Sequence, residues 1–289
     1  MNEKRIVDER SRDIGKFKVG RLLPVRQKRQ VGPFTFIDHM GPETLRKGFY
    51  MDVDQHPHIG LATLTYLFEG EIEHRDSLGS IQRITPGDAR FMTAGKGITH
   101  TERTPLDLRN DQDYPVHGYQ IWIALPEGLE EMEPVFEYLP NSEMPEWTEN
   151  DLKIRLVAGS GFERESKLKV WSPLFMVDVF ARSETSLDIR DRIKGELAIV
   201  VATGKVTANV DVIHPRRMLN TNTSQLDTLH FEKDTRVLLL GGQPFEKPRY
   251  LLWNFVSSRR ERLEQAKQDW KQKNFPKVPG DDTYVPIPF

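Results

Sequence analysis

The sequence LATLTYLF at residues 61–68, with the turn Glu69-Gly70-Glu71 and the segment IEHRD at residues 72–76, indicates a β-hairpin. Residues 61–68 are rich in side-chain types that favour strands, and the glycine can adopt the positive φ that a hairpin turn often needs. A further turn signal follows at Pro86-Gly87-Asp88. Short strands separated by turn residues at this spacing predict an all-β sandwich or barrel.

The strand pattern occurs twice. Residues 126–149 contain four prolines among many glutamates, and we interpret them as a solvated connection between two halves. Beyond this connection, the run LAIVVATGK after Lys194-Gly195-Glu196 loosely repeats the apolar strand and glycine turn that end at Glu71. We therefore expect two similar β domains in tandem, residues 1–130 and residues 150–289.

A short helix is expected near the C-terminus. Ser258-Arg259-Arg260-Glu261 fits a capping box, in which the serine and glutamate side chains satisfy free backbone N–H groups. Leu263, Ala266 and Trp270 follow at helical spacing and form a narrow apolar stripe, which we expect to pack on the core. Residues 276–289 carry four prolines and should be extended.

The composition excludes several classes of protein. The 289 residues are 37% hydrophobic and 29% charged, as expected of a globular chain, and the net charge of -2 favours neither nucleic acid nor a membrane surface. The chain has no cysteine, which excludes disulfides, iron–sulfur clusters and thiol nucleophiles. No signal peptide or membrane-spanning run is apparent, so we expect a cytoplasmic location, or a nuclear one in a eukaryote.

Two short motifs, His56-Pro57-His58 and His100-Thr101-Glu102, indicate a metal site. In a strand, residues i and i+2 point to the same face, so each motif can direct two ligands toward one point. An isolated histidine is more often a structural residue, but two such pairs about 40 residues apart favour a metal. After residue 117 the histidines are His214 and His230, and neither belongs to such a pair. We therefore expect a metal in the first domain alone.

These motifs closely resemble those of the pirin family, which are bicupins. The resemblance covers HPHIG and YLFEG within residues 56–70, MTAGKGITHTE at residues 92–102, GPF at residues 32–34 with Asp38, HGYQIW at residues 117–122 and GGQP at residues 241–244. It implies two tandem cupin (jelly-roll-like) β-barrels with iron in the N-terminal one. The implied metal ligands are His56, His58, His100 and Glu102. General cupins carry a ligand glutamate a few residues after the HxH pair, where this chain has Ala62 and Thr63, so Glu102 replaces that carboxylate.

The implied metal is Fe(II), although the same donors also accept Zn, Mn, Cu, Ni or Co. An octahedral ion with these four ligands retains two open positions, which can chelate a flavonol or other diphenolic substrate or bind O₂. The resemblance implies quercetin 2,3-dioxygenase activity. We also consider Glu102 a candidate catalytic base, which would leave the metal when substrate binds. The alternative is a non-catalytic regulatory protein that binds a transcription factor or metabolic enzyme in a metal- or redox-dependent way. A third and weaker option is an isomerase or a storage cupin.

Residues outside the ligand set are harder to assign. Ligating histidines usually donate their second N–H to a carboxylate or carbonyl, and the candidate acceptors are Asp38, Asp54, Asp76 and Gln120. For each of these four we favour a surface or turn position. We interpret His74 as a surface histidine in preference to one that lines the cavity, and His39 and His117 receive no role.

Overall fold

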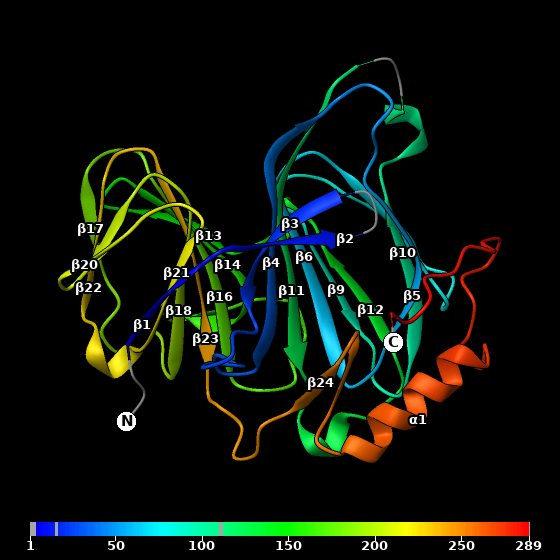
Figure 1. The fold of residues 1–289 in the computed structure, drawn as a ribbon. Coiled ribbons are helices and arrows are strands. Elements are labelled where there is room, and N and C mark those ends of the chain that lie inside the picture. The colour runs from blue at the N-terminus through cyan, green and yellow to red at the C-terminus, as the bar shows by residue number, and fades with distance from the viewer. Residues whose placement is uncertain (1–3, 15–16, 110–111, 289) are drawn as a thin grey trace. The chain divides into compact units, whose positions relative to one another are not determined.

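The computed structural model describes residues 4–14, 17–109 and 112–288 (Figure 1). Strands dominate, and α1 (Arg260–Lys271) is the one α-helix within these ranges. This confirms the predicted all-β class with a short C-terminal helix. No helix in the described ranges has the length and apolar character needed to span a membrane.

The described chain forms two compact units that do not follow chain order. Unit 1 consists of Met1–Arg10, Gly20–Ile37 and Ser142–Glu246, and unit 2 consists of Ser11–Val19, Asp38–Asn141 and Lys247–Phe289. The C-terminal residues therefore belong to the same unit as most of the N-terminal half of the chain. This differs from the expected grouping of the helix with residues 150–289.

Two sheets make up most of unit 2, and both are antiparallel in the registers described. The larger has seven strands in the order β12 (Val135–Leu139), β9 (Ala89–Thr93), β6 (Leu61–Glu69), β11 (Tyr114–Ala124), β4 (Phe34–Leu45), β3 (Phe17–Leu23) and β2 (Arg10–Ile14). The smaller has four, in the order β5 (Asp52–His58), β10 (Ile98–Arg103), β7 (Ile72–Asp76) and β8 (Ile81–Ile84). β3 and β4 carry the chain between the units.

Unit 1 has the same two-sheet plan. Its larger sheet has the order β1 (Arg5–Asp8), β21 (Arg217–Asn222), β18 (Glu196–Thr203), β23 (Thr235–Gly242), β16 (Leu174–Ala181), β14 (Leu152–Gly161) and β13 (Glu146–Glu149), with β15 (Arg164–Glu165) beside β14. Its smaller sheet has the order β17 (Thr185–Asp188), β22 (Thr228–Phe231), β19 (Val206–Ala208) and β20 (Asp211–Ile213). Within the described residues, the strand order leaves every sheet open at its edges.

Both strands and the turn predicted at residues 61–76 are present, but the predicted hairpin is wrong, because β6 belongs to the seven-stranded sheet and β7 to the four-stranded one. β6 and β7 flank Gly70, whose φ is +80°. A Cβ at this position would lie 2.3 Å from the carbonyl oxygen of Pro115, so both the conformation and the close approach require glycine. The turn predicted at Gly87 also occurs, between β8 and β9.

The acidic, proline-containing segment is more ordered than the sequence suggested. β12 pairs with β9, and β13 pairs with β14, so residues 126–149 contribute one edge strand to each larger sheet. The prolines Pro134, Pro140 and Pro145 stand just outside these two strands, where no ladder hydrogen bond is lost. The interpretation as a solvated connection was therefore wrong for these strands.

The helix α1 packs as predicted but begins differently. Leu263, Ala266 and Trp270 are buried against Ile59 and Phe255, and this contact places the helix in unit 2. Phe255 belongs to a short hairpin of β24 (Tyr250–Leu252) and β25 (Phe255–Ser257).

The predicted capping box is absent. The N-cap residue is Arg259, without a side-chain cap. The Ser258 hydroxyl instead donates to the carboxylate of Glu130. In a capping box Glu261 would accept from the backbone N–H of Ser258, but this N–H also donates to the buried Glu130 carboxylate, at 2.8 Å.

Candidate metal centre

The two histidine motifs meet across neighbouring strands of unit 2. β5 and β10 are antiparallel, and their register places His56 opposite His100 and His58 opposite Ile98. Directly opposed residues point to the same face of a sheet, so the three imidazoles share one face. One ring nitrogen of each of His56, His58 and His100 lies within 4.8 Å of the others. The structure therefore brings three of the four candidate ligands together.

The ladder between β5 and β10 contains a β-bulge. His100 pairs with His56, but Glu102 pairs with Val53, so three steps along β5 match two steps along β10. Asp54 and Gln55 are thus the two residues opposite the single residue Thr101. Bulges of this kind re-aim neighbouring side chains and are common beside functional sites.

Backbone carbonyls fix the orientation of two of the imidazoles. His56 Nδ1 lies 2.8 Å from the carbonyl oxygen of Asp54, and His58 Nδ1 lies 3.1 Å from that of Asn254. A carbonyl only accepts, so each Nδ1 must carry the proton and donate. The Nε2 atom of each ring then retains its lone pair for a ligand bond.

The third imidazole is oriented by a relay of buried side chains. His74 Nε2 lies 3.0 Å from the Asp76 carboxylate, and His74 Nδ1 lies 3.3 Å from His100 Nδ1. The carboxylate fixes the proton of His74 on Nε2, so His74 Nδ1 accepts from His100 Nδ1. The relay therefore leaves the Nε2 lone pair of His100 free of a proton.

His74 is not a surface residue, contrary to the sequence-based interpretation, whereas Asp76 has a turn position, where its carboxylate accepts from the backbone N–H groups of Leu78 and Ser80. Both His74 and Asp76 are fully buried, because the register of β7 with β10 places Asp76 opposite His100 and His74 opposite Glu102. Burial lowers the pKa of His74 to about 4, which keeps this ring neutral. Burial raises the pKa of Asp76, but the hydrogen bond from His74 lowers it below its usual range overall. The spacing of His74 and Asp76 shows from sequence that both side chains share one face of a strand. The sequence does not show that this strand, β7, pairs with β10.

The three imidazoles fit a divalent transition metal. Burial lowers the pKa of His56, and lowers those of His58 and His100 well below the usual value, so all three rings are neutral ligands at physiological pH. His100 Nε2 is buried and has no hydrogen-bond partner. An orphaned buried nitrogen of this kind is costly unless it binds something, and a metal is a suitable occupant.

Glu102 lies beside the imidazole cluster but outside the group of converging ligand atoms. Its Oε1 atom accepts from the fully buried Arg90 guanidinium and lies 3.2 Å from the Thr65 hydroxyl, whose single proton is donated to Gln120. Its negative charge acts on His56, where it partly offsets the lowering of the pKa by burial. The carboxylate is thus held within electrostatic reach of the cluster through one of its two oxygens.

Side chains from the larger sheet form the other wall of this interior. Arg90 Nη1 donates to the Thr63 hydroxyl at 3.0 Å, and the Thr65 hydroxyl donates to Gln120 Oε1 at 2.6 Å. The Trp122 ring meets the His58 ring edge to face, with centroids 5.1 Å apart. Sequence reasoning missed Arg90 because no motif marks a single buried cation.

The remaining candidates have other positions. Asp54 contributes its backbone carbonyl to His56, whereas its side chain is half exposed and pairs with Arg103. Gln120 is partly buried and joins the network of Thr65, and Asp38 is fully buried, so neither is the surface residue that the sequence favoured. His39 and His117 lie 3.1 Å apart through their Nε2 atoms, in a separate aromatic cluster with Phe68 and Tyr119.

Comparisons with known proteins agree with this description. The Pirin family model matches residues 16–123, and the model of the Pirin C-terminal cupin domain matches residues 176–276. A pirin-like protein of Caulobacter vibrioides is 41% identical over 288 residues, which cover 98% of both chains. The two cupin domains expected from the sequence are therefore confirmed.

Solved structures show the same fold. A quercetin 2,3-dioxygenase of Acinetobacter baumannii has a TM-score of 0.91 and 35% identity, over 99% of this chain and 95% of that one. The Escherichia coli pirin YhhW, solved in complex with nickel(II), has a TM-score of 0.67 and 21% identity, over 84% of this chain and all of that one.

Proposed function

Since the chain belongs to the pirin family, we propose that unit 2 holds one divalent metal ion, Fe(II), through His56, His58 and His100, with Glu102 as the fourth ligand. The observation that carries this proposal is the convergence of three neutral imidazoles on one point, with His100 Nε2 buried and unpartnered. The carboxylate supports iron over a purely nitrogen-binding ion, because it adds charge and a hard oxygen donor. Zn, Mn, Cu, Ni and Co remain compatible with the same donors.

The activity that we propose is oxygenation of a flavonol such as quercetin, or of a related diphenolic compound. A bound divalent metal supplies Lewis acidity toward hydroxyl and carbonyl oxygens and a path for electrons to O₂. A protein named quercetin 2,3-dioxygenase shares 35% identity and nearly the whole fold, which supports this substrate class.

Residues of the chain itself have separate tasks in this proposal. Arg90 holds Oε1 of Glu102, so the other oxygen, Oε2, is the one that would bind the metal and that, once a substrate displaces it, could take the proton of a substrate hydroxyl. The positive guanidinium also favours the anionic form of such a substrate. Trp122 covers His58 and excludes water from this side of the ligand cluster.

The test is turnover of quercetin by protein loaded anaerobically with Fe(II) and then exposed to air. We expect loss of flavonol absorbance and release of carbon monoxide. Glu102→Gln should retain much of the metal but lose turnover, because the amide cannot accept the proton. Unchanged flavonol absorbance with fully loaded protein would reject the activity, and full turnover by Glu102→Gln would reject the role of Glu102.

A second candidate function is metal- or redox-dependent binding of a protein partner in the cytoplasm or nucleus. The observation in its favour is that unit 1 retains a complete cupin fold around an apolar interior. Among the residues that the structure describes, the group of potential metal ligands lies in unit 2 and not in unit 1. Affinity for a transcription factor or a metabolic enzyme that changes with the oxidation state of iron, with no turnover of flavonols or diphenols, would favour this function.

A further inference from the structure

Gln55, the neighbour of His56, is bound on all sides by the C-terminal segment, which we define as residues 278–285. Its side-chain Nε2 donates to the carbonyl oxygens of Asp281, at 2.7 Å, and Thr283, at 3.0 Å. Its Oε1 accepts from the Val278 backbone N–H at 2.8 Å. Its backbone N–H donates to the Thr283 hydroxyl, and its carbonyl accepts from the Val285 N–H at 2.9 Å. Every polar atom of Gln55 thus has a partner in this segment.

These contacts provide hydrogen-bond partners for the backbone groups of Gln55 in the bulge between β5 and β10. β5 is an edge strand, and Asp54 and Gln55 are the bulged pair opposite Thr101. A bulge leaves backbone groups outside the ladder, and an unpaired buried group is costly. Gln55 is only 3% exposed, so these groups cannot rely on water. The C-terminal segment supplies the partners that β10 does not.

The same segment reaches the other ligand strand. Arg103, directly after Glu102 on β10, donates to the Asp281 carboxylate and, at 2.9 Å, to the Thr283 hydroxyl. It also pairs with Asp54, the residue whose carbonyl orients His56. One short segment therefore binds residues adjacent to ligand candidates on both strands.

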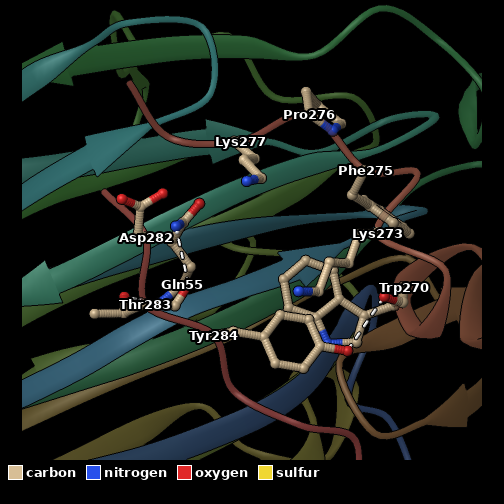
Figure 2. A pocket seen from close by; sticks show the side chains of 9 residues that line it. All are labelled: Gln55, Trp270, Lys273, Phe275, Pro276, Lys277, Asp282, Thr283 and Tyr284. Carbon is tan, nitrogen blue, oxygen red and sulfur yellow. Dashed lines mark hydrogen bonds between the residues drawn. The ribbon is translucent and has the colours of Figure 1, made fainter. Parts of the chain in front are cut away.

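The helix α1 anchors this segment (Figure 2). Tyr284 stacks on Trp270 with ring centroids 4.6 Å apart, and Trp270 Nε1 donates to the carbonyl oxygen of Val285 at 2.9 Å. The pocket between Gln55, Lys277 and these rings has a volume of about 50 Å³, which accommodates a few water molecules but not an organic substrate. We therefore interpret the region as a structural contact and not as a second ligand site.

We propose that Gln55 is a positioning residue for the metal centre: with the C-terminal segment it fixes the bulge of β5, and thereby the carbonyl of Asp54 and the ring of His56. This inference rests on the proposed metal site. It does not depend on the identity of the substrate or on catalysis.

The test is a titration of the metal-free, full-length protein with Co²⁺ in competition with a chelator, followed through the visible absorption of bound cobalt. Gln55→Leu removes the amide but keeps a side chain of similar size, and Thr283→Val removes one hydroxyl from the opposite side of the contact. Gln265→Leu is the matched control, because Gln265 is exposed on α1 of the same unit and its amide donates to Asp269 within the helix. Hydrogen exchange of the metal-free variants measures the opening of the backbone hydrogen bonds of β5 separately from those of the rest of the fold.

We expect Gln55→Leu to weaken Co²⁺ binding about 10-fold or more, as changes beside metal ligands usually do, and Thr283→Val to weaken it less. The cobalt spectrum should change, and exchange should rise in β5 but not in unit 1, whereas a merely structural role would lower thermal stability alone. Should Gln55→Leu fail to fold, the Thr283→Val titration decides. Wild-type Co²⁺ affinity in both variants would overturn the role of Gln55 and leave the proposed metal site intact. A wild-type protein that binds no Co²⁺ would overturn the role of Gln55 and the metal site together.

Discussion

The interiors of the two units differ, although both units have the two-sheet cupin plan. The core of unit 1 is an apolar cluster drawn from both sheets, which includes Leu197, Leu219 and the ring of Phe231. The corresponding space in unit 2 contains the buried imidazoles of the three metal-ligand candidates, the buried imidazole of His74 and the buried guanidinium of Arg90. The difference shows that the fold does not require a polar interior, so the polar groups of unit 2 need a functional explanation.

The largest expected effect concerns the apolar interior. Phe231→Ala removes a ring that is 1% exposed in the core of unit 1 and should cost about 3–5 kcal/mol of unfolding free energy. Metal affinity should not change, because the ring lies outside the unit that carries the imidazoles. Denaturant unfolding together with a Co²⁺ titration checks this. A large loss of Co²⁺ affinity in protein that is still folded would contradict the separation of roles between the units.

The second effect concerns the ligand set. His100→Ala should weaken Co²⁺ binding about 100-fold or more, since it removes a ligand and not merely its support. His230→Ala is the matched control, because His230 is an exposed histidine of unit 1 bound to the Ser186 hydroxyl. Equal affinity in the two variants would show that the imidazole cluster is not the metal site.

A third and smaller effect tests the relay behind His100. In Asp76→Asn, the remaining oxygen should stay with the backbone N–H groups of Leu78 and Ser80, which directs the amide NH₂ at His74 Nε2. His74 must then carry its proton on Nδ1, which opposes the N–H of His100 and reverses its tautomer. We expect a 10- to 100-fold loss of Co²⁺ affinity, of order 1.4–2.7 kcal/mol.

Asp54→Asn is the control for this relay. Asp54 is two residues from His56 in sequence and serves it through its backbone carbonyl, which the substitution retains. Its affinity should stay within a factor of about two of the wild type. A comparable loss in both variants would mean that negative charge alone, and not the tautomer, supports the site.

Much of this arrangement could be predicted from the sequence. The alternation of side chains in a strand is enough to place His56 on the same face as His58, and His100 on the same face as Glu102. The turn at Gly70 and the apolar stripe of α1 were equally readable, because each depends on local geometry.

The unpredicted features all depend on contacts between residues far apart in the chain. The buried position of His74 requires knowledge that β7 pairs with β10. The bulge at Gln55 and its contacts with residues 278–285 join segments more than 220 residues apart. The place of α1 in unit 2 likewise follows from its packing on Ile59, which no local pattern encodes.

Anomalous diffraction from crystals of the Fe(II)-loaded protein tests the contrast between the two units most directly. We predict one iron peak per chain, bonded to Nε2 of His56, His58 and His100, and none within the apolar interior of unit 1. A peak bonded through Nδ1, a peak in unit 1, or no peak among these three imidazoles would contradict this assignment.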